Sequence, residues 1–216
     1  MTKDALLAQI HADRVIGLVN GDLGDQLIAC AGALADGGIH FLEVAMTTPA
    51  ALKGLEVACA RLPDFRFGLG TVLDVETARL GILAGVSFIA TPAPRPDVIT
   101  TCRRFQVPVF SGAFTREDIR TAHHAGADAI KVFPREQFGP AYIKTLAAEL
   151  PGILLFPIGG VTPTTIAEFL RAGAAAAYAG TSLLEQSALD RADWASISAT
   201  SSRFREAVTT HSNLKQ

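Results

Sequence analysis

The sequence predicts an α/β fold, a single-domain (β/α)8 TIM barrel. Eight short apolar runs recur along 216 residues, and the spacing of about 27 residues leaves room for one strand, one helix and two turns in each unit. The runs are apolar at successive positions, which is typical of parallel strands covered by helices. The chain length also lies within the range of such barrels. An open doubly wound sheet is the alternative, but eight even units without a switch point favour closure.

The predicted strands are residues 15–19, 41–45, 67–70, 87–90, 107–110, 129–133, 153–158 and 175–178. Segments with helical periodicity lie between them, for example residues 26–34. Thr115 and Asp118 have the spacing of a helix-starting capping box. Gly85, Gly126 and Gly173 each follow an alanine shortly before a predicted strand, as expected of helix ends. The domain is expected to span residues 1–216, with a helical extension at 185–208 and a frayed polar tail at 209–216.

Composition excludes several classes of partner. Nineteen basic residues stand against 21 acidic residues, a formal net charge of -2, whereas nucleic-acid binding normally requires a basic excess. No apolar run approaches the roughly 18 residues of a membrane helix, and residues 1–5 lack the pattern of a secretion signal. Cys30, Cys59 and Cys102 are far apart, which favours a reducing cytoplasm over a disulfide framework or a zinc site.

Two charged residues interrupt the apolar strands. Lys131 lies in Ala-Ile-Lys-Val-Phe and Glu43 in Phe-Leu-Glu-Val-Ala. Their strand neighbours are large and aliphatic and are expected to meet the helices, so alternation directs Lys131 and Glu43 into the barrel. An amine among apolar side chains loses hydration, which disfavours its ammonium form. A neutral amine forms imines with carbonyl substrates, and a nearby carboxylate can move the protons that the imine steps require.

Other interpretations of this pair stay open. The two residues could form a buried ion pair that only neutralises itself. A barrel isomerase or epimerase would use Glu43 as its base and Lys131 as an electrostatic partner. A catalytically silent binding barrel and a decarboxylase that uses the same imine are further alternatives.

Glycines follow the last two predicted strands, in Ile158-Gly159-Gly160-Val161 and Ala179-Gly180-Thr181-Ser182. Barrels often bind phosphate at this place, because glycine lets backbone N–H groups approach the oxygens. Ordinary turn chemistry would also explain each glycine alone. Their occurrence in neighbouring loops favours a phosphate site without an arginine clamp.

The chain resembles a family at this point, the class I aldolases that cleave 2-keto-3-deoxy-6-phosphogluconate and related 2-keto acids (KDPG/KHG aldolases). The resemblance covers roughly residues 15–184, and residues 133–144 look closest to the phosphogalactonate (KDPGal) branch. The segments that carry it are 42–44 (Leu-Glu-Val), 68–73 (Gly-Leu-Gly-Thr-Val-Leu), 91–92 (Thr-Pro), 129–134 (Ala-Ile-Lys-Val-Phe-Pro), 158–163 (Ile-Gly-Gly-Val-Thr-Pro) and 180–182 (Gly-Thr-Ser).

The resemblance implies an aldehyde-lyase that forms a Schiff base on Lys131, uses Glu43 as general acid and base, and releases pyruvate and glyceraldehyde 3-phosphate. It implies a homotrimer that needs no metal or other cofactor, and a small phosphorylated keto acid as the substrate. A related lyase acting on 4-hydroxy-2-oxoglutarate is the alternative within the family. The residues that it assigns to the pyruvyl group are Thr71, Pro92 and Phe133, and those that it assigns to the phosphate are Gly159, Gly160, Gly180 and Ser182.

The chain departs from the family pattern at three positions. Asn20 stands where a basic residue is usual, Thr47 where an arginine is usual, and Ser111 where a proline is common. Threonine cannot reproduce the bidentate fork with which arginine grips a carboxylate, although the phosphogalactonate branch tends to a small polar residue there. Our hypothesis is that Thr47 lies at the substrate and that Arg135, on the same rim as Phe133, partly compensates.

Overall fold

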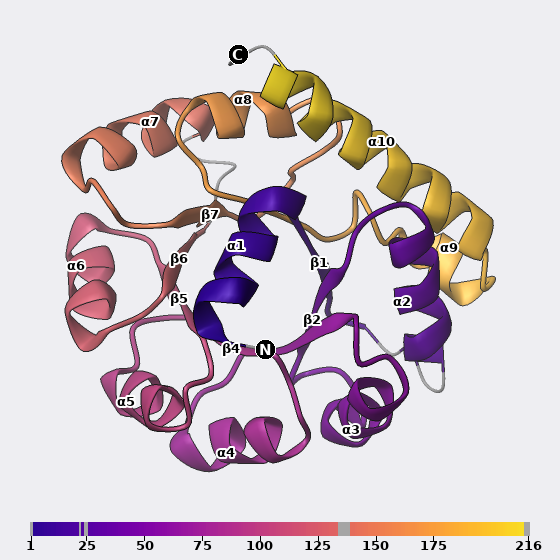
Figure 1. Cartoon of the computed structure of the whole chain (residues 1–216), viewed down its shortest axis with the longest axis horizontal. Coiled ribbons are helices and arrows are strands. Elements are labelled where there is room, and N and C mark those ends of the chain that lie inside the picture. The colour runs from indigo at the N-terminus through magenta and orange to yellow at the C-terminus, as the bar shows by residue number, and fades with distance from the viewer. Residues whose placement is uncertain (1, 22, 24–25, 134–138, 214–216) are drawn as a thin grey trace.

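The computed structural model describes residues 2–21, 23, 26–133 and 139–213, and it confirms the (β/α)8 barrel. Eight parallel strands lie in the order β7-β6-β5-β4-β3-β2-β1-β8, inside a ring of helices (Figure 1). The strands are β1 (Val15–Val19), β2 (Phe41–Ala45), β3 (Arg66–Gly70), β4 (Phe88–Thr91), β5 (Val109–Ala113), β6 (Ala129–Val132), β7 (Leu155–Pro157) and β8 (Ala177–Ala179).

The barrel closes between β7 and β8 without a regular strand ladder. The N–H of Ala175, just before β8, donates to the carbonyl of Leu155 in β7 at 3.0 Å. On its other side β8 pairs with β1, with Tyr178 opposite Ile16. This contact completes the ring, so the last strand is held beside the first and the seventh.

The outer helices are α2 (Leu27–Asp36), α3 (Ala51–Arg61), α4 (Val75–Leu83), α5 (Pro96–Arg104), α6 (Arg116–Ala125), α7 (Gly139–Glu149), α8 (Ile166–Arg171), α9 (Gln186–Asp190) and α10 (Trp194–Asn213). The predicted capping box of Thr115 and Asp118 is present at the start of α6. Gly85, Gly126 and Gly173 all have positive φ, of 86°, 96° and 105°, which is the left-handed conformation that favours glycine after a helix. No helix in the described ranges is both long and apolar enough to span a bilayer.

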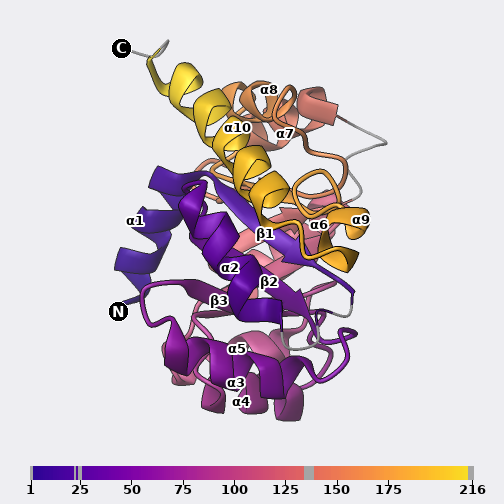
Figure 2. The ribbon, with the colours of Figure 1, turned by 90° about the vertical axis from the view of Figure 1, so that its right-hand side faces the viewer.

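An additional helix, α1 (Lys3–Asp13), lies across the end of the barrel where the strands begin (Figures 1 and 2). Its Leu6 and Ile10 are buried against the side chains of the barrel interior. Lys3 forms an ion pair with Asp128 at 2.8 Å, just before β6. The helix therefore covers part of the barrel at this end and leaves the opposite end, where the strands finish, without such a cover.

Strand alternation produces two cores. Leu42, Val44, Ile130 and Val132 belong to the large cluster between strands and helices. The smaller cluster fills the barrel interior with aromatic side chains from five strands: Phe41, Phe88, Phe110, Phe156 and Tyr178. Glu43 and Lys131 take the alternate positions on β2 and β6, so both enter the interior as alternation predicts.

Six of the eight strands have bounds that differ by one to three residues from the sequence predictions; β7, for example, is Leu155–Pro157 rather than 153–158, and β8 is Ala177–Ala179 rather than 175–178. Strand β5 extends to Ala113 rather than ending at Phe110, because its ladder with β6 continues through Gly112 opposite Lys131. Helix α10 continues to Asn213 and so extends into the segment 209–216, which the sequence analysis expects to be a frayed polar tail. The hydroxyls of Thr209 and Thr210 donate to carbonyls one turn earlier, both at 2.9 Å, so these polar residues are accommodated in the helix.

Candidate active site

The centre of the site is an ion pair inside the barrel. Lys131 Nζ, from β6, donates to Glu43 Oε1, from β2, at 2.6 Å. The two side chains are 9% and 1% exposed, respectively. A pair that is so short and so well shielded interacts strongly, because little water screens it. The amine and the carboxylate predicted from two separate strands are thus in direct contact.

Glycine makes room for the carboxylate. Gly70 lies opposite Ala45 at the end of the β2–β3 ladder, and a β carbon at position 70 would stand 2.1 Å from Glu43 Oε1. Gly112 lies beside Lys131 in the β5–β6 ladder, where a β carbon would stand 2.2 Å from the Pro92 carbonyl oxygen. Residues without side chains therefore create the space around the pair.

Tyr178 is a third member of the centre, and the sequence analysis missed it. Lys131 Nζ lies 4.5 Å from the centre of the Tyr178 ring. The Tyr178 hydroxyl and Glu43 Oε2 are both buried without a hydrogen-bond partner in the described structure. Burial first, and then the nearby charge of Glu43, raise the pKa of Tyr178 well above its ordinary value. The signal in the sequence was the single large side chain at an inward position of the alanine-rich strand β8.

The residues expected at the pyruvyl group lie at the same end of the barrel as the ion pair. Thr71 follows β3, Pro92 follows β4 and Phe133 follows β6. Thr71 has a φ of 58°, which is uncommon for a residue other than glycine and costs conformational energy. Pro92 and Phe133 line a shared hollow of about 250 Å³, and Phe133 is 55% exposed.

The glycine loops after β7 and β8 are tied to each other. Gly159 and Gly160 both have positive φ, of 106° and 55°, a backbone that larger residues rarely adopt. Ser182 donates its hydroxyl hydrogen to the carbonyl of Val161. The Gly180 carbonyl accepts from two N–H groups of the following turn. The Ser182 hydrogen bond therefore joins the two loops.

The two positions where the family usually carries cations are joined by a neutral contact. Thr47 follows β2, Asn20 follows β1, and the Thr47 hydroxyl donates to Asn20 Oδ1. Both residues are exposed at the rim. Arg135, the hypothetical compensating cation, lies outside the described residues. Ser111 is fully buried beside Thr91, with 3.4 Å between their hydroxyl oxygens.

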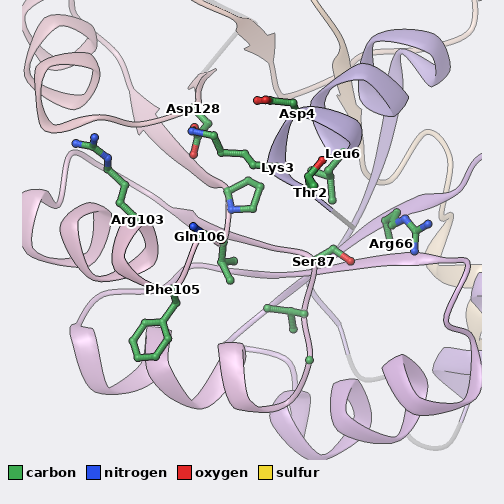
Figure 3. Close-up of a pocket in the computed structure, with 14 residues that line it drawn as sticks. Thr2, Lys3, Asp4, Leu6, Arg66, Ser87, Arg103, Phe105, Gln106 and Asp128 are labelled. Carbon is green, nitrogen blue, oxygen red and sulfur yellow. The ribbon is translucent and has the colours of Figure 1, made fainter.

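A second hollow, larger than the one beside Phe133, lies elsewhere in the described structure. About 760 Å³ in volume, it is lined by α1 and by the starts of β3 to β6, including Lys3, Arg66, Arg103 and Asp128 (Figure 3). Lys131 and Glu43 do not line it. Within the described ranges, no group of three or more His, Cys, Asp or Glu side chains is placed to hold a metal ion.

A buried lysine in contact with a carboxylate inside a (β/α)8 barrel is the arrangement expected of an imine-forming lyase. The family model described as "KDPG and KHG aldolase" matches residues 7–200. The chain belongs to the KDPG and KHG aldolase family.

Named relatives and a solved structure agree with this assignment. The chain is 30% identical to a 2-dehydro-3-deoxy-phosphogluconate aldolase of Pseudomonas aeruginosa, over 92% of this chain and 90% of the relative. It is 34% identical to a 2-dehydro-3-deoxy-6-phosphogalactonate aldolase of Escherichia coli, over 78% and 83%. The KDPG aldolase of Legionella pneumophila, solved with pyruvate captured as a covalent carbinolamine, superposes with a TM-score of 0.82 at 26% identity, over 91% of this chain and 96% of that one.

Proposed function

We propose that the protein is a class I aldolase that reversibly cleaves a phosphorylated 2-keto-3-deoxy sugar acid, KDPG or KDPGal, to pyruvate and glyceraldehyde 3-phosphate. The observation that carries this proposal is the 2.6 Å contact between Lys131 Nζ and Glu43 Oε1 inside the barrel. It joins a nucleophile for the keto group to a base that can move its protons. Family membership supports the same reaction class.

Imine formation begins with a proton transfer. The Lys131 ammonium gives a proton to Glu43, and the neutral amine attacks C2 of the keto acid. The attacking nitrogen gives up one proton and the C2 oxygen gains one, so that a neutral carbinolamine with a C2 hydroxyl forms. That hydroxyl then leaves as water, with the proton returned by Glu43, and the product is a cationic imine on Lys131.

Carbon–carbon cleavage uses this imine as an electron sink. Glu43, through a water molecule, takes the proton of the C4 hydroxyl. The C3–C4 bonding electrons move into the imine, which gives an enamine on Lys131 and releases the C4 aldehyde as glyceraldehyde 3-phosphate. Protonation at C3 and attack of water on the resulting imine release pyruvate and restore the amine.

The surrounding residues would bind the two ends of the substrate. Thr71, Pro92 and Phe133, which follow β3, β4 and β6, would surround the pyruvyl group. The phosphate would lie against the backbone of Gly159, Gly160 and Gly180 and of Ser182. We expect N–H groups to dominate there, because the Ser182 hydroxyl hydrogen is already donated to Val161.

Borohydride reduction in the presence of pyruvate tests this proposal. It should leave a reduced pyruvyl adduct on Lys131, located by peptide mass mapping. Lys144 is a natural internal control, because it lies on the outer helix α7 and should stay unmodified. The absence of an adduct on folded protein would refute the imine mechanism and leave the isomerase interpretation.

Substrate identity is tested by comparing kcat/KM for the two epimers of the phosphorylated acid and for 4-hydroxy-2-oxoglutarate. We expect the phosphorylated acids to be preferred, because the two glycine loops then contribute to binding. A preference for 4-hydroxy-2-oxoglutarate would contradict the phosphate assignment without affecting the imine.

We further propose a homotrimer in the cytoplasm. The family resemblance motivates the trimer, and exposed apolar side chains support self-association: Leu80 and Leu83 of α4 are 52% and 71% exposed, which is typical of residues covered in an assembly. The three cysteines are free thiols, as expected in a reducing compartment. Light scattering should give three times the chain mass of 22.7 kDa, and a monomer would contradict the trimer.

A further inference from the structure

We propose that Tyr178 is a positioning residue of this site, whose ring stabilises the positive charge on the Lys131 nitrogen and whose hydroxyl donates to Glu43 Oε2. The inference rests on the proposed aldolase function and adds a residue to it. It follows from the placement of Tyr178 against both members of the ion pair.

The ring faces the nitrogen that carries charge during the reaction. Lys131 Nζ is 4.5 Å from the ring centre, within the range of a cation–π interaction. The same nitrogen is positive in the ammonium and in the cationic imine. A ring held in place before the reaction therefore stabilises the imine without reorganisation.

The Tyr178 hydroxyl can supply a hydrogen bond that the Glu43 carboxylate lacks. Glu43 Oε1 accepts from Lys131. Among the residues that the structure describes, neither Glu43 Oε2 nor the Tyr178 hydroxyl has a hydrogen-bond partner, and both are buried. Two orphaned buried polar atoms are costly, and one can donate what the other accepts. A hydrogen bond between them would hold the carboxylate with Oε1 toward the amine.

Packing alone does not account for a tyrosine at this position. The other aromatic members of the interior cluster are all phenylalanines: Phe41, Phe88, Phe110 and Phe156. A phenylalanine at 178 would fill the same layer without burying a hydroxyl. Within this cluster, the one tyrosine is at the position whose ring faces Lys131. This placement indicates that its hydroxyl interacts with the ion pair.

The phenol acts as a donor and not as a base. Burial and the charge of Glu43 both raise the pKa of Tyr178, so it keeps its proton across the working range. The titratable groups that face it are Glu43 from β2 and Lys131 from β6. The neighbouring β1 and β7 contribute the apolar Ile16 and Phe156.

Kinetics of Tyr178→Phe test the hydroxyl. We expect kcat to fall about tenfold, the value of one hydrogen bond to a charged group, with KM for the keto acid nearly unchanged. The acid limb of the kcat/KM profile should move to higher pH, because the ionised carboxylate loses a donor. Tyr178→Leu should also slow borohydride trapping, since it removes the ring. Phe110→Leu, in the same cluster, is the control and should keep the wild-type pH profile.

The outcomes separate this inference from the function on which it rests. If the wild-type protein gives no adduct on Lys131, the aldolase proposal fails first. If the wild-type protein is trapped and Tyr178→Phe keeps its kcat and pH profile, the role of Tyr178 is wrong. An unchanged kcat together with a higher melting temperature in Tyr178→Phe would show that the hydroxyl is buried without a function and only destabilises the fold.

A spectroscopic measurement keeps the inference testable should Tyr178→Phe not fold. The chain has only two tyrosines, so 3-fluorotyrosine labelling gives two 19F signals, and Tyr142→Phe assigns them. Borohydride trapping of pyruvate should shift the Tyr178 signal, because the nitrogen that faces the ring then carries a carboxylate-bearing substituent. A Tyr178 signal that stays in place would overturn the inference.

Discussion

Gly70 and Glu43 lie so close that a single carbon atom added at position 70 would collide with the Glu43 carboxylate. The β carbon of an alanine at position 70 would stand 2.1 Å from Glu43 Oε1 and 2.6 Å from its carboxyl carbon. The orientation of Glu43 toward Lys131 thus depends on a neighbour that has no side chain. Glycine at position 70 therefore matters for the space that its missing β carbon leaves beside Glu43, and not for its backbone freedom.

Gly70→Ala should lower kcat/KM by about a hundredfold, because displacement of a catalytic group by an ångström has an effect of this size. Steady-state kinetics and borohydride trapping measure the loss. Gly32→Ala is the matched control, since a β carbon there meets nothing within 4 Å and alanine favours the helix α2. Wild-type activity in Gly70→Ala would show that Glu43 does not need this position.

The sequence was most informative where a residue contradicted its surroundings. Lys131 and Glu43 are charges inside apolar strands, and period-two alternation suffices to direct both into the barrel. Tyr178 offers no such contradiction, because a tyrosine is ordinary in a buried strand. Its proximity to Lys131 depends on which rings meet across the closed barrel, and that is a property of three-dimensional packing.

The limits of the strand predictions have a similar origin. Strand β5 continues through Ser111 and Gly112, which carry little apolar signal, because hydrogen bonds to β6 determine its length. The Thr47–Asn20 contact is equally invisible in sequence, since it joins residues 27 apart at the ends of neighbouring strands. The hydropathy of a residue indicates whether that residue is buried. Hydrogen bonds between strands and contacts between loops at the barrel rim depend instead on which two residues meet.

Removal of one member of the central ion pair should destabilise the fold. Lys131→Met leaves the Glu43 carboxylate buried without its partner, which costs about 3–5 kcal/mol in comparable pairs. Urea unfolding at pH 7 measures the change. The double variant Lys131→Met with Glu43→Leu should recover much of the loss, because two apolar side chains need no partner.

An exposed ion pair provides the control for that experiment. Arg116 and Glu149 also form an ion pair, but their side chains are 54% and 44% exposed. Arg116→Met should therefore cost less than about 1 kcal/mol. If Lys131→Met lowers the free energy of unfolding no more than Arg116→Met does, the ion pair between Lys131 and Glu43 does not behave as a buried pair.

Thr71 combines backbone strain with a predicted substrate contact. Its φ of 58° suits glycine, so Thr71→Gly should raise stability by up to about 1 kcal/mol, the strain relieved less the entropy that glycine adds to the unfolded chain. Activity should fall about tenfold, because a hydroxyl that binds the substrate carboxylate contributes about 1.5 kcal/mol. Thermal unfolding and kinetics measure both effects.

Two further variants separate strain from binding at Thr71. Thr71→Ala keeps the strain and removes the hydroxyl, so it should lose activity without gaining stability. Ala50→Gly relieves the same backbone conformation, φ 53°, at the start of α3, and should leave kinetics unchanged. Full activity in Thr71→Ala would remove this residue from the substrate site.

Acid should weaken helix α6 through its capping box. The Asp118 carboxylate accepts from the N–H groups of Thr115 and Phe114 at 2.9 and 3.2 Å. These hydrogen bonds, with the Thr115 backbone N–H contributing most, lower the pKa of Asp118. A carboxyl whose pKa is lower in the folded state stabilises the fold above its unfolded pKa of about 3.9, and loses that contribution as the pH falls through the folded value.

Asp118→Asn should therefore lower the free energy of unfolding by about 0.5–1 kcal/mol at pH 7, and the difference from wild type should shrink as the pH falls below about 4. Urea unfolding at pH 7, 5 and 3 measures it, with Glu117→Gln as the control, because Glu117 lies in the same first turn but is not the partner of Thr115 in the capping box. A difference that stays constant from pH 7 to pH 3 would show that the Asp118 charge does not stabilise the helix.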